Sequence, residues 1–214
     1  MLRKNHNYKL IMRYTILWIV CAIVVFYPLY SARKTLITAD DGFNQYYPVF
    51  RYLRGWYKGI VTGDVKMFDL VIGLGDDVIG TLNYYGLGDI LLIPFCLAPT
   101  SLLDISYTLS ILFRLYLAGA VFLFLFNNEV PAYSRCTGAI IYSFCPYVFE
   151  NALMFLNFAT PLVWLPVITA GVKDILNGKK RFSKKLFFGG TFPIFEWFLL
   201  FIHDCVSFFR IHTS

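Results

Sequence analysis

The sequence predicts an all-α membrane protein, with about five transmembrane helices and an outward loop that carries short amphipathic helices. Hydrophobic residues make up 58% of the 214 residues and charged residues only 15%. A soluble domain carries about 45–50% apolar and about 25% charged residues. The mean hydropathy is +0.61. A core of this size cannot bury so much apolar surface, so lipid must solvate much of the chain.

The first transmembrane helix is predicted at residues 14–30, an apolar stretch without a charged side chain. It lacks a small-residue cleavage site, so we interpret it as an uncleaved anchor rather than a removed signal peptide. The preceding tail, residues 1–13, holds four basic residues and no acid. Because basic residues stay on the cytoplasmic side, the tail is predicted to be cytoplasmic and the chain to be a multi-pass protein of a cytoplasmic membrane.

Residues 31–88 contain twelve charged residues and several glycine-rich turns. This stretch is too long and too polar to cross a bilayer, so we predict a large extracytoplasmic loop. Within it, residues 43–60 place aromatic and basic side chains on opposite faces at helical spacing. That pattern indicates either a helix lying on the membrane surface or a helix packed on its own loop.

The rest of the chain alternates apolar and polar segments. We predict an apolar re-entrant or interfacial segment at 89–104, transmembrane helices at 105–126, 136–150 and 152–172, a basic cytoplasmic loop at 173–185, a fifth transmembrane helix at 186–203 and an atypical tail at 204–214. The basic loop has six Lys or Arg residues and one Asp. Counting crossings places it inside, where its charge predicts it to be. Since the basic residues lie at the ends of apolar segments, no nucleic-acid partner is predicted.

The acids gather in the outward loop as two adjacent pairs, Asp40-Asp41 and Asp76-Asp77. Paired carboxylates beside a membrane can hold a divalent cation through oxygen ligands. One of them can instead act as a general base toward a hydroxyl. The alternative is that these residues cap helices, because Asp is a favoured N-cap residue.

Arg114 lies near the middle of the predicted second span. A guanidinium at that depth costs about 2.5 kcal/mol or more, so it usually faces a partner or a wet cavity. The phosphate of an anionic headgroup is one such partner. Snorkelling toward the interface is the alternative, and the central position disfavours it.

Two strings in the loop, ADDGFNQYYPVFRYLRGWYKG and FDLVIGLGDDVIGTLNYYGLGDILL, are followed by LFRLYLAGAVFLFLF in the second span. Together they make residues 10–185 resemble the N-terminal region of the bacterial YfhO family of membrane proteins. Members of that family resemble GT-C glycosyltransferases, which transfer a sugar from a polyprenyl-phosphate carrier outside the cytoplasmic membrane. The resemblance implies a GT-C-like N-terminal portion, and a truncated chain that is inactive by itself.

The resemblance also implies roles for particular residues. The catalytic base, or the ligand of a divalent cation if one is bound, falls on Asp41 or Asp40; no other cofactor is implied. The implied substrate-binding residues are Asn44, Gln45, Tyr46, Tyr47, Asp76, Asp77 and Arg114. Arg114 and the loop cations Arg51, Arg54 or Lys58 would stabilise the leaving phosphate.

The implied partners are membrane lipid, a polyprenyl-phosphate sugar donor and a cell-wall polymer acceptor such as lipoteichoic acid. The alternative function is a non-catalytic multi-span membrane protein, such as a transporter or an assembly subunit, or an inactive fragment. Acids clustered outside the spans favour the enzyme, because a transporter places polar groups along several spans at the midplane.

Overall fold

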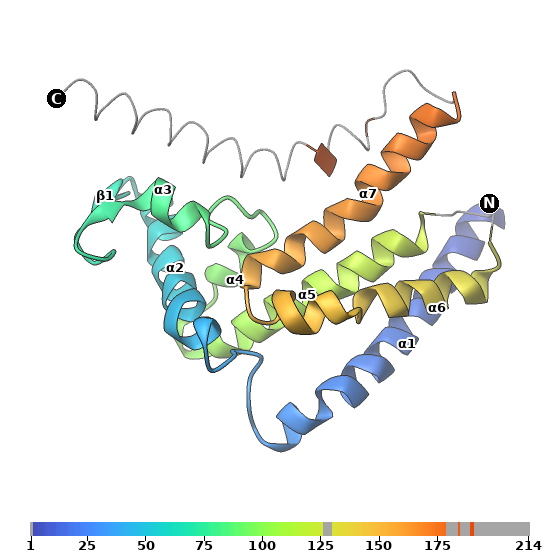
Figure 1. Cartoon of the computed structure of the whole chain (residues 1–214), viewed down its shortest axis with the longest axis horizontal. Helices are drawn as coiled ribbons and strands as arrows, with labels where there is room; N and C mark the ends of the chain where they lie inside the picture. The colour runs from blue at the N-terminus through green and yellow to red at the C-terminus, as the bar shows by residue number, and fades with distance from the viewer. Residues whose placement is uncertain (1, 126–129, 179–183, 185–188, 191–214) are drawn as a thin grey trace.

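The computed structural model describes residues 2–125, 130–178, 184 and 189–190, and Figure 1 shows how its helices are arranged. In chain order the elements are α1 (Leu2–Ser31), η1 (Gly42–Tyr46), α2 (Tyr47–Thr62), β1 (Phe68–Asp69), β2 (Asp76–Asp77), α3 (Val78–Asn83), α4 (Ile93–Cys96), η2 (Thr100–Leu102), α5 (Leu103–Leu123), α6 (Ala132–Ser143), η3 (Val148–Ala152), η4 (Leu156–Phe158) and α7 (Ala159–Leu176). Among these residues, strand structure is confined to the antiparallel pair β1–β2.

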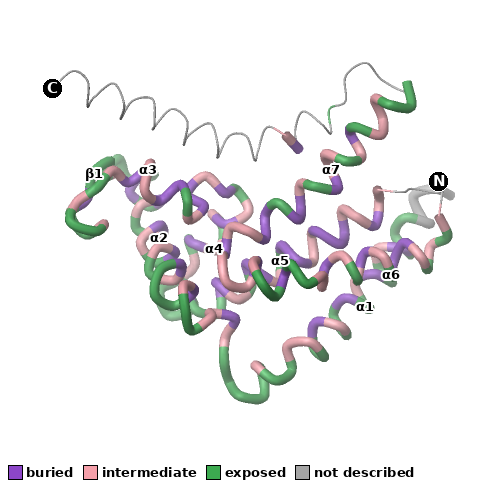
Figure 2. The backbone as a smooth tube through the Cα atoms, viewed as in Figure 1, coloured by how far each residue is buried: buried purple, intermediate pink, exposed green. Residues whose placement is uncertain are grey.

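Three stretches in the described part of the chain are helical, long and apolar enough to cross a membrane: Asn7–Ser31, Thr100–Leu123 and Leu156–Leu176. They contain most of α1, all of α5 and all of α7. In the most apolar window, half of the α5 residues but only 17% of the α1 residues are buried. Figure 2 shows the same contrast along the two helices. The predicted all-α membrane fold is confirmed, with α5 as its central helix.

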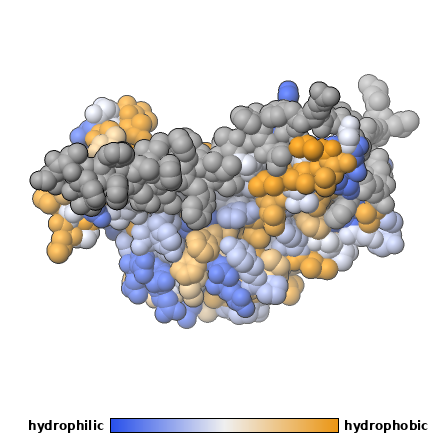
Figure 3. Space-filling view, turned by 45° about the horizontal axis from the view of Figure 1, so that its top comes forward, coloured by the Kyte–Doolittle hydropathy of each residue, from blue (hydrophilic) through white to orange (hydrophobic). Residues whose placement is uncertain are grey.

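The exposed surface of these helices is strongly apolar. Along α1 the exposed large hydrophobic residues include Ile16, Leu17, Ile19, Val20, Ile23 and Val24. Figure 3 shows that hydrophobic residues also gather in patches on the face that it presents. Surface of this kind is unfavourable in water and is what a hydrocarbon core solvates.

The predicted third span, 136–150, is a broken helix in the structure. Helix α6 ends at Ser143, and the π-helix η3 begins only after Pro146. A proline donates no N–H, and its ring clashes with the carbonyl four residues earlier, so an α-helix is interrupted there. With 12 residues, α6 rises about 18 Å, which is short of the roughly 30 Å of a hydrocarbon core.

The predicted fourth span, 152–172, corresponds to the apolar stretch Leu156–Leu176. It begins later than predicted because residues up to Ala152 belong to η3. The predicted fifth span, 186–203, and the tail after it lie outside the described residues, apart from Gly189 and Gly190.

The ends of helices α1, α5, α6 and α7 fall on two sides of the molecule. Figure 1 shows the start of α1, the end of α5, the start of α6 and the end of α7 on one side of the molecule. The Arg135 side chain of α6 confirms part of this, because its Nε donates to the backbone oxygen of Leu123 at the end of α5, at 2.9 Å. The end of α1, the start of α5 and the loop between them lie toward the other side (Figure 1).

Helices α1, α5 and α6 approach closely at Gly119. The Tyr14 hydroxyl donates to the backbone oxygen of Tyr116 at 2.8 Å and lies 3.2 Å from Ser143 Oγ. Ser143 Oγ in turn donates to the backbone oxygen of Ala139 at 2.9 Å. A Cβ at position 119 would lie 2.1 Å from Ser143 Oγ and 2.3 Å from the Tyr14 hydroxyl. The missing side chain therefore allows the helices to share this polar seam.

Helix α2 packs its aromatic face on the protein itself. The Phe50 ring meets the Tyr107 ring of α5 edge-on, with centroids 5.4 Å apart. Arg54 Nε donates to the backbone oxygen of Ala98 at 2.6 Å. Of the two interpretations of residues 43–60, the structure therefore has the helix packed on the protein rather than with its aromatic face on a membrane.

Replacing Gly119 with alanine is expected to destabilise the helix packing, because the new methyl group would lie 2.1 Å from Ser143 Oγ. Overpacking of this kind costs about 1–3 kcal/mol. The matched control is Gly55→Ala in α2, where an added Cβ meets nothing within 4 Å and alanine favours the helix. Thermal unfolding of the purified chain in detergent should show a lower midpoint for Gly119→Ala only. Equal midpoints for the two variants would contradict this account of the seam.

Candidate functional site

A cavity of about 820 Å³ lies beside the loop-side end of α1. Its apolar walls are formed by Leu29, Leu36, Ile37, Phe43 and Leu153. Its charged and phenolic lining residues are Arg33, Lys34, Tyr47 and Asp104. Ligand sites are typically cavities of about 300–1,000 Å³, so this one is large enough for a sugar or a phosphate headgroup.

Asp40 and Asp41, the predicted catalytic pair, lie between two lining residues of this cavity, Ala39 and Phe43. Asp40 is exposed and Asp41 is half-buried. Asp41 holds the N-cap position of η1, but its side chain makes no capping hydrogen bond. Its Oδ1 instead accepts a hydrogen bond from the Gln45 amide at 2.6 Å. The capping alternative therefore does not describe this side chain, and its catalytic role stays a prediction.

Gln45 and Asn44, both predicted to bind substrate, follow the acids by about one turn. While Gln45 Nε2 holds Asp41, its Oε1 accepts from the Tyr85 hydroxyl at 2.9 Å. Burial, and to a smaller extent the charge of Asp41, raise the pKa of Tyr85, so this phenol remains a donor at neutral pH. The Asn44 side chain is exposed, and its backbone N–H donates to the Asp40 carbonyl at 3.0 Å.

The two tyrosines that follow differ in position. Tyr46 is only 2% exposed, its ring lies 5.0 Å from that of Tyr85 between centroids, and burial raises its pKa. Tyr47 lines the cavity, and its hydroxyl donates to Asp104 Oδ1. Of the two, Tyr47 is therefore the one with access to a molecule in the cavity.

Asp76 and Asp77 lie beyond the other end of α2. Asp77 caps α3, because its Oδ2 accepts from the Gly80 backbone N–H at 2.6 Å, and Asp76 Oδ2 accepts from the Thr81 hydroxyl at 2.8 Å. The capping alternative is therefore confirmed for Asp77. The 16 residues of α2 rise about 24 Å, and Figure 1 shows β1 at the opposite end of α2 from the turn that precedes η1. The structure does not bring the two acid pairs together.

Arg114 is fully buried and forms an ion pair with Asp89. Its Nη2 donates to Asp89 Oδ2 at 2.9 Å, and its Nη1 donates to the backbone oxygen of Leu156 at 2.9 Å. Both charged side chains are 0% exposed. The Thr160 hydroxyl donates to the same carboxylate oxygen at 2.6 Å. The partner that the sequence requires for Arg114 is thus an acid of the loop, and no exposed guanidinium atom is left for a substrate phosphate.

Sequence reasoning misses Asp89, although a signal for it exists. It is the acid in the YYGLGD motif, directly before the apolar stretch that leads to α5. An arginine in the middle of an apolar span requires a counter-ion within the protein. Acids close to the span along the chain are therefore candidate counter-ions of Arg114. In the structure the counter-ion is Asp89.

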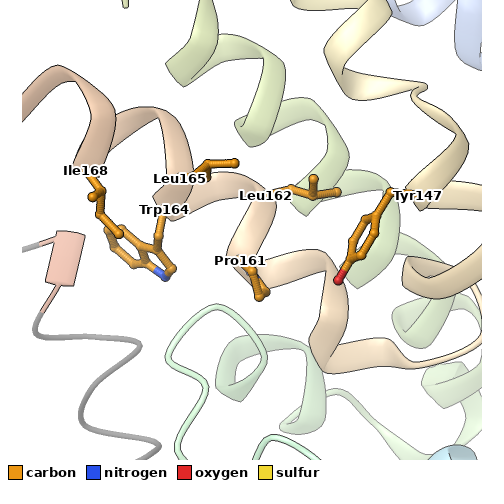
Figure 4. Close-up of a pocket in the computed structure, with 6 residues that line it drawn as sticks. All are labelled: Tyr147, Pro161, Leu162, Trp164, Leu165 and Ile168. Atoms are coloured by element: carbon orange, nitrogen blue, oxygen red, sulfur yellow. The ribbon is translucent and has the colours of Figure 1, made fainter.

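A second cavity, of about 510 Å³, lies along α7. It is lined by Tyr147, Pro161, Leu162, Trp164, Leu165 and Ile168. In Figure 4 the Trp164 and Tyr147 rings lie on either side of Pro161. No carboxylate, histidine or cation lies in this lining, so we place the candidate functional site at the first cavity.

The family model described as bacterial membrane protein YfhO matches residues 15–192. The chain belongs to the YfhO family. The match includes the second half of α1, the loop with both acid pairs, and α5 to α7, so the resemblance carried by the loop motifs is confirmed. No curated protein and no solved structure matches the chain.

Side chains that could bind a metal ion are few at each place in the described part of this YfhO chain. Within the part of the chain that the structure describes, no three His, Cys, Asp or Glu side chains form a group that could hold a metal ion. Asp40 and Asp41 provide carboxylate oxygens at adjacent positions, and a divalent cation bound there stays a prediction.

Replacing Arg114 with methionine is expected to cost about 3–5 kcal/mol of stability, because it leaves the Asp89 carboxylate buried without its counter-ion. Adding Asp89→Asn should restore part of that loss, since the amide removes the charge and keeps an oxygen for Thr160. The measurement is thermal unfolding in detergent, with Arg51→Met on the exposed face of α2 as the control. A double variant no more stable than Arg114→Met would contradict the pairing.

Proposed function

We propose that this YfhO chain provides the acid-bearing portion of a membrane glycosyltransferase. The enzyme moves a sugar from a polyprenyl-phosphate carrier to an extracytoplasmic cell-wall polymer such as lipoteichoic acid. One observation carries the proposal: along the chain, Asp41 lies between Ala39 and Phe43, which line an 820 Å³ cavity at the loop-side end of an apolar helix. At such a position a lipid-linked donor can enter from the membrane and a water-soluble hydroxyl from the loop side.

The chemistry requires one base and one leaving group. The Asp41 carboxylate takes the proton of the acceptor hydroxyl as that oxygen attacks the anomeric carbon of the sugar. The bond between the anomeric carbon and the phosphate oxygen breaks, and its electron pair leaves with the lipid phosphate. Because attack and departure occur on opposite faces of the sugar, the configuration inverts. A positioned general base of this kind contributes about 10²–10⁴-fold to the rate.

The surroundings of Asp41 suit a base. Its half-buried carboxylate accepts one hydrogen bond, from Gln45 at 2.6 Å, and no ion pair holds it among the described residues. Gln45 is itself fixed by the Tyr85 hydroxyl. The carboxylate is thus oriented by an uncharged amide and keeps lone pairs for an incoming hydroxyl.

We also propose that the N-terminus is cytoplasmic and that the loop with its cavity faces outward. Two features support this orientation. Most of the basic tail forms the start of α1, and the basic loop 173–185 begins in the last turn of α7; these two helix ends lie on one side of the molecule (Figure 1). Basic residues are retained on the cytoplasmic side of a membrane, so the acid-rich loop on the other side reaches the cell surface.

Replacing Asp41 with asparagine is expected to lower sugar transfer at least about 100-fold, because the amide cannot accept the hydroxyl proton. Transfer is measured in membranes that contain a full-length member of the YfhO family with the matching substitution, from a labelled polyprenyl-phosphate sugar to the polymer. Asp64→Asn, an exposed acid of the same loop, is the matched control and should keep full activity. Full transfer by the Asp40→Asn, Asp41→Asn double variant would contradict the base and favour a non-catalytic role.

The orientation predicts a difference between two introduced cysteines. A cysteine at Thr62, exposed at the end of α2, should react with an impermeant thiol reagent in intact cells. A cysteine at Asn177, exposed just after α7, should react only after the membrane is permeabilised. The unaltered chain, with its native cysteines, sets the background. Labelling of Asn177→Cys alone in intact cells would reverse the orientation.

A further inference from the structure

The turn that ends α1 has a cation where helices usually place glycine. The backbone N–H of Lys34 donates to the Leu29 carbonyl at 2.9 Å, and that of Arg33 donates to the Tyr30 carbonyl at 3.0 Å. These two bonds form a Schellman motif, whose left-handed residue is most often glycine. Here that residue is Arg33, with φ of 55°.

Arg33 is the only non-glycine residue with positive φ in the described part of the chain. Five other described positions adopt positive φ, and all five are glycines: Gly63, Gly73, Gly75, Gly86 and Gly178. A side chain in this conformation costs roughly 1 kcal/mol or more and persists where the surroundings hold it. The backbone of this turn alone would favour glycine. The arginine is therefore explained by an interaction of its guanidinium group.

Arg33 and Lys34 both line the 820 Å³ cavity. Neither side chain forms an ion pair with a described carboxylate. By contrast, the buried arginines of the helices are occupied, Arg114 by Asp89 and Arg135 by the Leu123 carbonyl. Two exposed, unpaired cations in a cavity are available for an anion.

The rest of the cavity defines what kind of anion fits. Leu29, Leu36 and Phe43 give it apolar walls, and the cations begin two residues after α1 ends at Ser31. The end of an apolar helix lies at the level of lipid headgroups. Asp104 is the acid in this lining and accepts the Tyr47 hydroxyl hydrogen bond, so two cations against one carboxylate leave a net positive charge. The fitting ligand is a phosphate joined to a hydrocarbon chain.

We propose that Arg33 and Lys34 bind the lipid phosphate of the sugar donor, with its first isoprenoid carbons against the apolar walls. Naming the donor as an isoprenoid phosphate rests on the proposed function. The linker is held in place for this role, because the Leu36 N–H donates to Thr108 Oγ1 of α5 at 3.3 Å. Asp41, eight residues further along the same linker, then lies beside the sugar end of the bound donor.

The test is binding of farnesyl phosphate by the full chain in phosphatidylcholine nanodiscs, measured by titration calorimetry. Farnesol and inorganic phosphate are the comparison ligands, and each should bind at least about tenfold more weakly than farnesyl phosphate. The variant Arg33→Gly, Lys34→Gln should weaken farnesyl phosphate binding at least about tenfold, because charge-assisted bonds to phosphate are lost. Glycine suits the turn, so Arg33→Gly should unfold at the same temperature as the unaltered chain or a higher one.

The matched control is Lys9→Gln, Arg13→Gln, which removes the same charge from exposed positions near the start of α1, outside the lining of the 820 Å³ cavity. It should change the affinity less than about twofold, since exposed charges outside contact distance are largely screened. Equal weakening by both pairs would show that net charge alone decides binding and would overturn the proposal. Equal binding of farnesol, or stronger loss from the α1 pair, would also overturn it.

Sugar transfer separates this inference from the proposed function. If the cavity pair is required for farnesyl phosphate binding but the full-length family member transfers no sugar, the phosphate site stands and the glycosyltransferase proposal fails. If Asp41→Asn abolishes transfer while Arg33→Gly, Lys34→Gln leaves both binding and transfer intact, the phosphate site fails and the glycosyltransferase proposal stands.

Discussion

Arg114 and Asp89 bring opposite charges to a position where neither side chain has any exposed surface. A single ion there would cost several kcal/mol, so each charge requires the other. The two residues come from segments 25 positions apart, and the Thr160 hydroxyl of α7 completes the set at 2.6 Å from the carboxylate. Any arrangement that separates the loop from α5 and α7 leaves a charge unpaired in apolar surroundings. The position of the loop is therefore coupled to the packing of the helices.

This coupling also determines where the cavity forms. From the anchored loop, the Arg54 guanidinium reaches the Ala98 carbonyl at 2.6 Å and so holds α2 against the segment before α5. On the other side, Thr108 of α5 accepts from the backbone of Leu36. Leu36, and Asp104 from the first turn of α5, both line the cavity. A rigid helix thus positions a loop that carries the polar groups, which is a common arrangement for binding and catalytic residues.

Helices and caps, which depend on residues close together in the chain, are predicted well from the sequence. Contacts between distant segments are predicted poorly. Apolar runs predicted α1, α5 and α7 because a chain in lipid must satisfy its backbone hydrogen bonds within helices. The cap at Asp77 followed from residues next to it. By contrast, Asp89 as the counter-ion of Arg114, and Tyr85 as the partner of Gln45 across 40 positions, depend on how distant segments meet. The predicted third span, 136–150, extends past the end of α6 at Ser143, because the apolar run continues through the proline at 146 that interrupts the helix.

The cavity shows how a local inconsistency can indicate function. Glycine occupies each of the other described positions with positive φ, so the residue type suits the backbone conformation at those positions. Such agreement is the expected state of a natural sequence, and exceptions concentrate at functional or strained sites. The exception here, Arg33, lies in the lining of the cavity that Asp41 borders. A purely structural turn would be more stable with glycine, whereas a phosphate-binding turn needs the guanidinium. The same position cannot satisfy both demands, and an arginine there is what the proposed phosphate site predicts.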